Sequence, residues 1–195
     1  LNTLQLQGLS SAQFAALTTA QAGALASLNS TLLTRLNTAA VGALSTSSLS
    51  ALTTAQLAGL GSTQLGVLST SQVAAFNTAQ FAKFGSSQLS GLNTTQMAAL
   101  STGVLTNLTS TQLTALTTRQ FAALTTAQLD ALTTAQLFSL TSNQLRALTT
   151  DQLSNLSTAD FAAFTSTQLG SLTTTQLRGL ETADLARLDT LQLSG

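Results

Sequence analysis

The sequence predicts an all-α solenoid, a superhelical rod in which each eight-residue repeat contributes one very short helix. Two observations support this prediction: the repeat itself, and a helix-start signal inside each copy. The repeat is clearest between Leu116 and Leu140, where LTTRQFAALTTAQLDALTTAQLFSL contains three copies. Because the same unit recurs along the chain, we interpret residues 1–195 as a single repeat array.

Two apolar positions, three residues apart, define each unit. They recur without a gap from Leu33/Leu36 to Leu185/Leu188. Substitutions at these positions stay apolar, as in the pair Phe81/Phe84, so we expect both positions to be buried. One unit cannot cover its own leucines, and stacking of successive coils is therefore required for stability.

The helix-start signal surrounds the residue that follows the second apolar position. Thr125 is a preferred N-cap residue, and Gln128 three residues later completes a capping box. Leu124 and Leu129 occupy the two positions of a hydrophobic staple. The cap position holds Ser, Thr, Asn, Gly or Asp in nearly every unit, with Glu181 as the exception. A short helix is therefore expected to restart in each repeat.

Several features of the unit leave alternatives open. The residue after the cap is also Ser or Thr; it is either the true cap in some units or a partner for the neighbouring coil. Glycine at Gly61 and Gly85 is expected to serve as a left-handed helix end as well as a cap. We expect Leu and Phe inside the rod and Ser, Thr and Gln outside. Small residues between the apolar positions should let adjacent turns approach closely.

Two other architectures could contain an eight-residue apolar repeat. Eight residues of a continuous helix turn about 800°, about 80° beyond two full turns, so its leucine stripe would rotate around the helix. No straight face would bury that stripe, which excludes one long helix. A spacing of three places the two apolar residues on opposite faces of a strand, and Leu, Ala and Gln favour helices. Because Thr favours strands, a β-solenoid remains the alternative fold.

The frame of the repeat changes near residues 20–29. Before Leu33 the eight-residue spacing has another phase, and the run QAGALASL from Gln21 lacks the polar half of a unit. A longer helix or a bend is expected there. The chain begins at Leu1 and ends within a unit at Gly195, which suggests a fragment of a longer array. Leu193, at an apolar position without a polar capping repeat, predicts end-to-end or lateral self-association.

Composition argues against most chemical functions. The chain has six basic and six acidic residues, no His and no Cys, so it lacks a basic face for nucleic acid or anionic membranes. No apolar run is long enough to cross a bilayer, so we expect no membrane insertion. We predict that the protein is not an enzyme and has no cofactor, catalytic residue or metal site. The nearest acidic cluster, Glu181, Asp184 and Asp189, is interpreted as a solvated edge in preference to a weak calcium site.

The copies of LTTAQL that begin at Leu52, Leu124 and Leu132 carry a family resemblance. The chain resembles the Leu/Thr/Gln-rich octapeptide-repeat arrays of long bacterial surface or secreted proteins. This resemblance implies an extracellular or cell-surface stalk or adhesive fibre. We therefore expect a structural or spacer segment of such a fibre. The alternative is a binding face, on the Ser/Thr columns, for ice, a glycan or a partner rod.

Overall fold

The computed structural model describes residues 10, 13, 33, 34, 36–180, 182–186, 188, 190 and 192. In this part of the chain the regular elements are short α-helices and there is no strand, which confirms the predicted all-α solenoid. The frame change predicted near residues 20–29 lies outside the described residues. The helices are α5 (Thr38–Gly42), α6 (Thr46–Ser50), α7 (Thr54–Leu57), α8 (Ser62–Gly66), α9 (Thr70–Ala74), α10 (Thr78–Phe81), α11 (Ser86–Leu89), α12 (Thr94–Ala98), α13 (Thr102–Thr106), α14 (Ser110–Thr114), α15 (Thr118–Ala122), α16 (Thr126–Asp130), α17 (Thr134–Ser139), α18 (Ser142–Ala147), α19 (Thr150–Ser154), α20 (Thr158–Phe161), α21 (Ser166–Gly170), α22 (Thr174–Arg178) and α23 (Thr182–Leu185).

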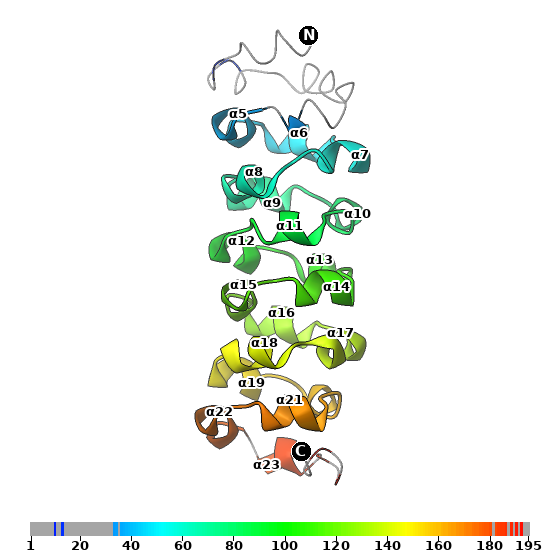
Figure 1. Cartoon of the computed structure of the whole chain (residues 1–195), viewed down its shortest axis with the longest axis vertical. Coiled ribbons are helices and arrows are strands. Elements are labelled where there is room, and N and C mark those ends of the chain that lie inside the picture. Colours follow the sequence, from blue (N-terminus) through cyan, green and yellow to red (C-terminus); the bar gives the residue numbers. More distant parts are fainter. Residues whose placement is uncertain are drawn as a thin grey trace. The chain divides into compact units, whose positions relative to one another are not determined.

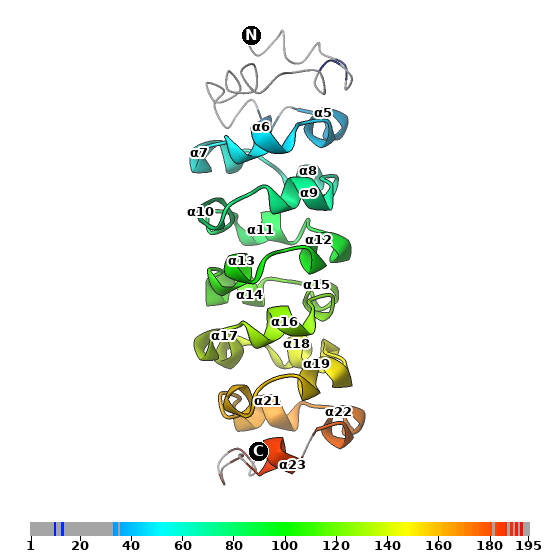
Figure 2. The ribbon, with the colours of Figure 1, turned by 180° about the vertical axis from the view of Figure 1, so that it is seen from behind.

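The chain divides into two compact units, Leu1–Leu100 and Ser101–Gly195. Within each unit the helices contact the third helix after them, as α5 contacts α8 in the first and α15 contacts α18 in the second. Figure 1, and Figure 2 from behind, show the consequence inside each unit: successive helices follow a coil, and the next coil stacks on it.

The capping signal explains where each helix begins. Thr125 has extended backbone angles, its hydroxyl accepts a hydrogen bond from the Gln128 N–H at 3.2 Å, and its own N–H donates to Gln128 Oε1 at 2.7 Å. From α5 to α22 the N-cap is the residue after the second apolar position. The Ser or Thr that follows the cap is the first helical residue, so it is not the cap. From α5 to α22 its hydroxyl makes no hydrogen bond to a neighbouring coil either, so neither alternative holds in these units.

The prediction of left-handed helix ends at Gly61 and Gly85 is wrong. Both residues are N-caps with negative φ, and no described residue has positive φ. Their N–H groups donate to Oε1 of Gln64 and Gln88, at 2.7 and 2.8 Å. The helices end without a left-handed residue, because the chain does not reverse at the helix end. A right-handed C-cap such as Ala131 is followed within two residues by the next N-cap, which is extended.

The two apolar positions form the core from Leu33 to Leu172, as predicted, whereas Leu177 and Leu185 are exposed. In the first unit, Phe76, Phe81 and Phe84 meet edge to face with ring centroids 5.3–6.0 Å apart. In the second, Phe161 and Phe164 form a similar pair at 5.8 Å. The small residues between these positions allow the expected close approach, because a Cβ on Gly91 would overlap the backbone of Ser62.

Glutamines at regular spacing form bridges between coils. The prediction that Gln lies on the outside is therefore wrong. Gln144 is only 2% exposed. Its Oε1 accepts from the N–H of the cap Thr141 at 3.1 Å, while its Nε2 donates to the carbonyl oxygens of Leu113 at 2.8 Å and Leu116 at 3.2 Å. One amide therefore caps its own helix and binds the preceding coil.

We call this arrangement the glutamine bridge. In each case Nε2 donates to the carbonyl oxygen 28 residues earlier, and a second acceptor lies 30 or 31 residues earlier. Because the bridge spans 28–31 residues while helix contacts link third neighbours, one turn of the coil takes between three and four units. The bridging residues are Gln64, Gln72, Gln80, Gln88, Gln96, Gln136, Gln144, Gln152, Gln168, Gln176 and Gln192.

The inside and outside assignment can be tested on adjacent residues. Leu129 is 1% exposed, whereas Asp130 is exposed. Leu129→Ala removes buried apolar contacts and should lower the free energy of unfolding by about 2–5 kcal/mol. Asp130→Ala should change it by less than about 0.5 kcal/mol. Hydrogen exchange should show that the Leu129 variant opens neighbouring coils too, and equal effects of the two substitutions would contradict the assignment.

The glutamine bridge can be tested by a nearly isosteric change. Gln144→Glu keeps the cap acceptor but replaces the donor with a charged oxygen facing the Leu113 and Leu116 carbonyls. Burying this unpaired charge should cost about 3–5 kcal/mol in chemical denaturation. Asn143→Asp makes the same chemical change at the exposed neighbouring residue and should cost under about 0.5 kcal/mol. A Gln144→Glu variant as stable as the Asn143→Asp control would mean that the bridge does not hold the coils together.

Candidate functional site

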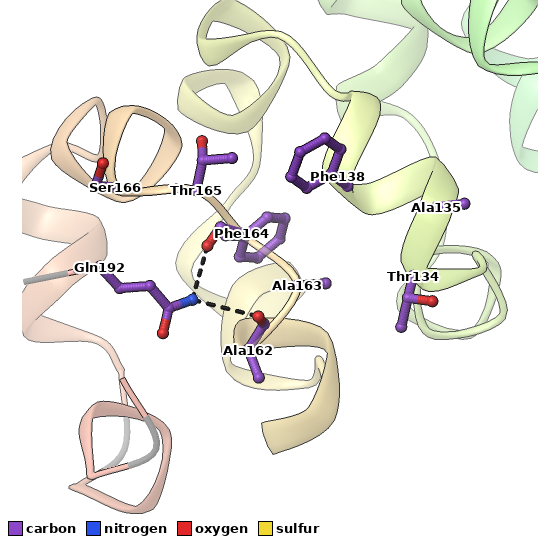
Figure 3. Close-up of a pocket in the computed structure, with 9 residues that line it drawn as sticks. All are labelled: Thr134, Ala135, Phe138, Ala162, Ala163, Phe164, Thr165, Ser166 and Gln192. Carbon is purple, nitrogen blue, oxygen red and sulfur yellow. Dashed lines mark hydrogen bonds between the residues drawn. The ribbon is translucent and has the colours of Figure 1, made fainter. Parts of the chain in front are cut away.

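A depression of about 530 Å³ on the second unit is the strongest candidate for a binding site. It is bounded by α17 on one side and by the turn from α20 into α21 on the other, with Gln192 across from α17 (Figure 3). The lining residues are Thr134, Ala135, Phe138, Ala162, Ala163, Phe164, Thr165, Ser166 and Gln192.

Phe138 is the unusual residue of this site. It directly follows the first apolar position, where other units carry small or polar residues, and its side chain is 62% exposed. By contrast, Phe164, at the second apolar position of its own unit, is 2% exposed. An exposed aromatic ring beside a depression is a common anchor for a ligand or partner. Phe138 was not predicted from the sequence, although it visibly departs from the small or polar residues at this position of other units.

Two of the polar side chains that line the depression already make hydrogen bonds, and two do not. The Gln192 Nε2 donates to the carbonyl oxygens of Ala162 at 3.3 Å and Phe164 at 2.7 Å (Figure 3). The Thr165 hydroxyl donates to Gln168 Oε1 at 3.1 Å. The hydroxyls of Thr134 and Ser166 make no hydrogen bond within the described part of the chain. The site therefore offers an aromatic face and two uncommitted hydroxyls.

The chemistry available at this depression is binding. None of its nine lining residues carries a titratable side chain, so the lining itself supplies no acid, base or charged ligand. A smaller depression of about 160 Å³, between α16 and α19, includes one carboxylate, Asp130, together with Thr126, Ala127 and Asn155.

Among the described residues, the charged side chains between the two apolar positions of a unit are exposed. Lys83, Asp130, Arg146 and Arg178 are exposed, whereas Arg187 is outside the described residues. Among the described residues no three His, Cys, Asp or Glu side chains gather as metal ligands. The acidic cluster noted in the sequence lies outside the described part of the structure. Glu181 and Asp189 are not among the described residues, and the side chain of Asp184 is not described.

The Ser/Thr columns, which the sequence offered as a binding face, divide into two kinds. The cap hydroxyls serve their own helices; Thr117, for example, accepts from the Gln120 N–H at 3.2 Å and donates to Gln120 Oε1 at 3.0 Å. The column formed by the first helical residues includes exposed members such as Thr118 and Thr126. Only this second column therefore leaves hydroxyls at the surface that are not needed for capping.

Comparison with known proteins supports the repeat array. Residues 46–78, 73–102 and 122–158 match a family model described as the ALTTAQ repeat. These stretches cover slightly less than half of the chain and include the LTTAQL copies at Leu52, Leu124 and Leu132. No curated protein matches the chain. In the part of the chain that the structure describes, no helix has the length and apolar character needed to span a bilayer.

Proposed function

We propose that this array is a structural spacer in an extracellular fibre or surface protein. The observation that carries the proposal is the glutamine bridge, which recurs with the same 28-residue reach in both units. If identical contacts join each coil to the preceding one, the number of repeats determines the length of the array. Such an element holds what lies beyond it at a fixed distance.

The surface chemistry supports a spacer of this kind. Each bridge takes the polar amide into the interior, so the outer surface consists mainly of hydroxyl and small side chains with few charges. The resemblance to arrays of bacterial surface and secreted proteins points to a location outside the cell. The ALTTAQ match supports the repeat itself and leaves the location to be tested.

Two exposed leucines favour association between arrays. Leu177 and Leu185 occupy the first apolar position but are 41% and 42% exposed, whereas the buried residues at that position expose at most 7%. A further coil, from the same chain or from another copy, would cover them. We propose that copies of the array associate end to end through such leucines.

The spacer proposal predicts that length follows repeat number. Insertion of one, two or three extra copies of Thr125–Leu132 after Leu132 should lengthen the particle by equal steps, because each whole unit extends the same coil. Small-angle scattering measures this length, and its forward intensity should also rise with concentration if copies associate.

Antibodies raised against the array should label intact cells of the source organism.

A half-unit insertion provides the matched control. A copy of Thr125–Gln128 after Leu132 shifts out of register the bridges that cross the insertion, those of Gln136, Gln144 and Gln152, and should unfold or divide the array. Whole-unit insertions that leave the particle length unchanged would contradict the spacer. Labelling confined to permeabilised cells would contradict the extracellular location, and a constant mass at high concentration would contradict association.

The Phe138 depression favours a second candidate function, the binding face. Its neutral lining, aromatic ring and free hydroxyls suit a glycan, which stacks a sugar ring on an aromatic side chain and hydrogen-bonds hydroxyls. Phe138→Ala should then abolish binding on a glycan array, with Val67→Ala, at another exposed apolar residue, as the control. The binding-face function is contradicted if the unaltered protein binds no glycan, or if Phe138→Ala does not change the binding. The spacer would then be the only proposed function.

A further inference from the structure

Asp160 interrupts the series of glutamine bridges. It occupies the bridging position of α20, where the units on either side have Gln152 and Gln168, and its side chain is 7% exposed. One carboxylate oxygen, Oδ2, accepts from the N–H of Ser157 at 3.0 Å and from its hydroxyl at 2.7 Å. Asp160 therefore reproduces the capping half of the bridge.

The other half of the bridge is missing. By the 28-residue rule, the acceptor in the preceding coil is the Leu132 carbonyl. The corresponding carbonyls of Leu140 and Leu148 each accept from a glutamine Nε2 at 2.7 Å. In the described part of the chain, the Leu132 carbonyl oxygen accepts no hydrogen bond, and Asp160 Oδ1 has no partner.

The geometry of the cap directs this free oxygen toward the preceding coil. In Gln168 the oxygen on the cap N–H and the nitrogen on the Leu140 carbonyl are the two branches of one planar group. In Asp160 the carboxylate is also planar and its Oδ2 occupies the cap. Its Oδ1 is therefore the branch that faces Leu132. Because aspartate is one methylene shorter than glutamine, its Oδ1 reaches less far toward the preceding coil than a glutamine Nε2 does.

Two facing oxygens repel each other unless a hydrogen-bond donor or a cation lies between them. An ionised carboxylate only accepts hydrogen bonds. No buried side-chain oxygen of the described residues lacks a partner, so Oδ1, which has none, is reached by solvent, and a dissolved cation has access to it. No Lys or Arg forms an ion pair with Asp160 in the described residues. Carboxylate and backbone carbonyl oxygens are ligands of hard cations, and calcium accepts them in flexible geometry, with water completing its shell.

We propose that Asp160 Oδ1 and the Leu132 carbonyl oxygen bind a calcium ion, which joins the two coils in place of a glutamine. The Leu129 carbonyl, 31 residues before Asp160, occupies the second acceptor position of the bridge and is a further ligand. With a single carboxylate the site is of low affinity, in the range of about 0.1–1 mM that extracellular calcium sites have. The array would then be complete only where calcium is plentiful.

Thermal unfolding of the whole chain in calcium chloride, with ionic strength held constant by potassium chloride, tests this site. At a calcium concentration ten times Kd, the Tm should rise by about 3–6 °C. Asp160→Asn removes the charge at nearly constant volume, and Asp160→Gln supplies the amide of the other units. Both variants should lose the calcium response. Asp160→Gln should also have a higher Tm than the unaltered chain without calcium, because it restores the bridge.

A matched variant and a second cation keep the test specific. Asp151→Asn removes an exposed carboxylate of α19 and should leave the response intact. Magnesium should produce a smaller shift, because it dehydrates reluctantly. An equal response of the unaltered chain and Asp160→Asn would overturn the proposal. A Tm of the unaltered chain that does not respond to calcium would also overturn it.

Discussion

The structure depends on the ability of a primary amide to accept and donate hydrogen bonds at the same time. In Gln144 the oxygen satisfies the start of its own helix, and the nitrogen satisfies the carbonyl groups that end a helix one coil earlier. Helices of four to six residues leave most of their terminal groups unpaired. A glutamine in most units resolves both ends together, so the coil is stable only as a stack.

Much of this fold was predictable because its signals are local. The cap at Thr125, the capping box with Gln128 and the buried leucines on either side all follow from an eight-residue window. The inward position of glutamine did not follow, because the partner of its nitrogen lies 28 residues away and no local pattern identifies it. The number of units per turn depends on the same distant contact, and for that reason it could not be derived either.

The candidate sites are departures from the repeat. Phe138 places a large ring where other units have a small or polar residue, and Asp160 places a carboxylate where most units have an amide. In a regular array the shared residues maintain stacking, and a residue that breaks the pattern without disturbing it is free for another role. Neither role was visible from motif spacing, since the relevant neighbours, the turn at Thr165 for Phe138 and the Leu132 carbonyl for Asp160, lie in other coils.

Exchange of the glutamine side-chain amide protons tests the bridge most directly. Nuclear magnetic resonance of the ¹⁵N-labelled chain resolves these groups from backbone amides. If the bridge joins the coils, the Nε2 protons of Gln136 and Gln144 should exchange only when coils separate, as slowly as the backbone N–H groups of the buried Leu137 and Leu145 beside them. The exposed side-chain amide of Asn143 should exchange at the rate of a free amide. Glutamine amide protons that exchange as fast as those of Asn143 would contradict the account.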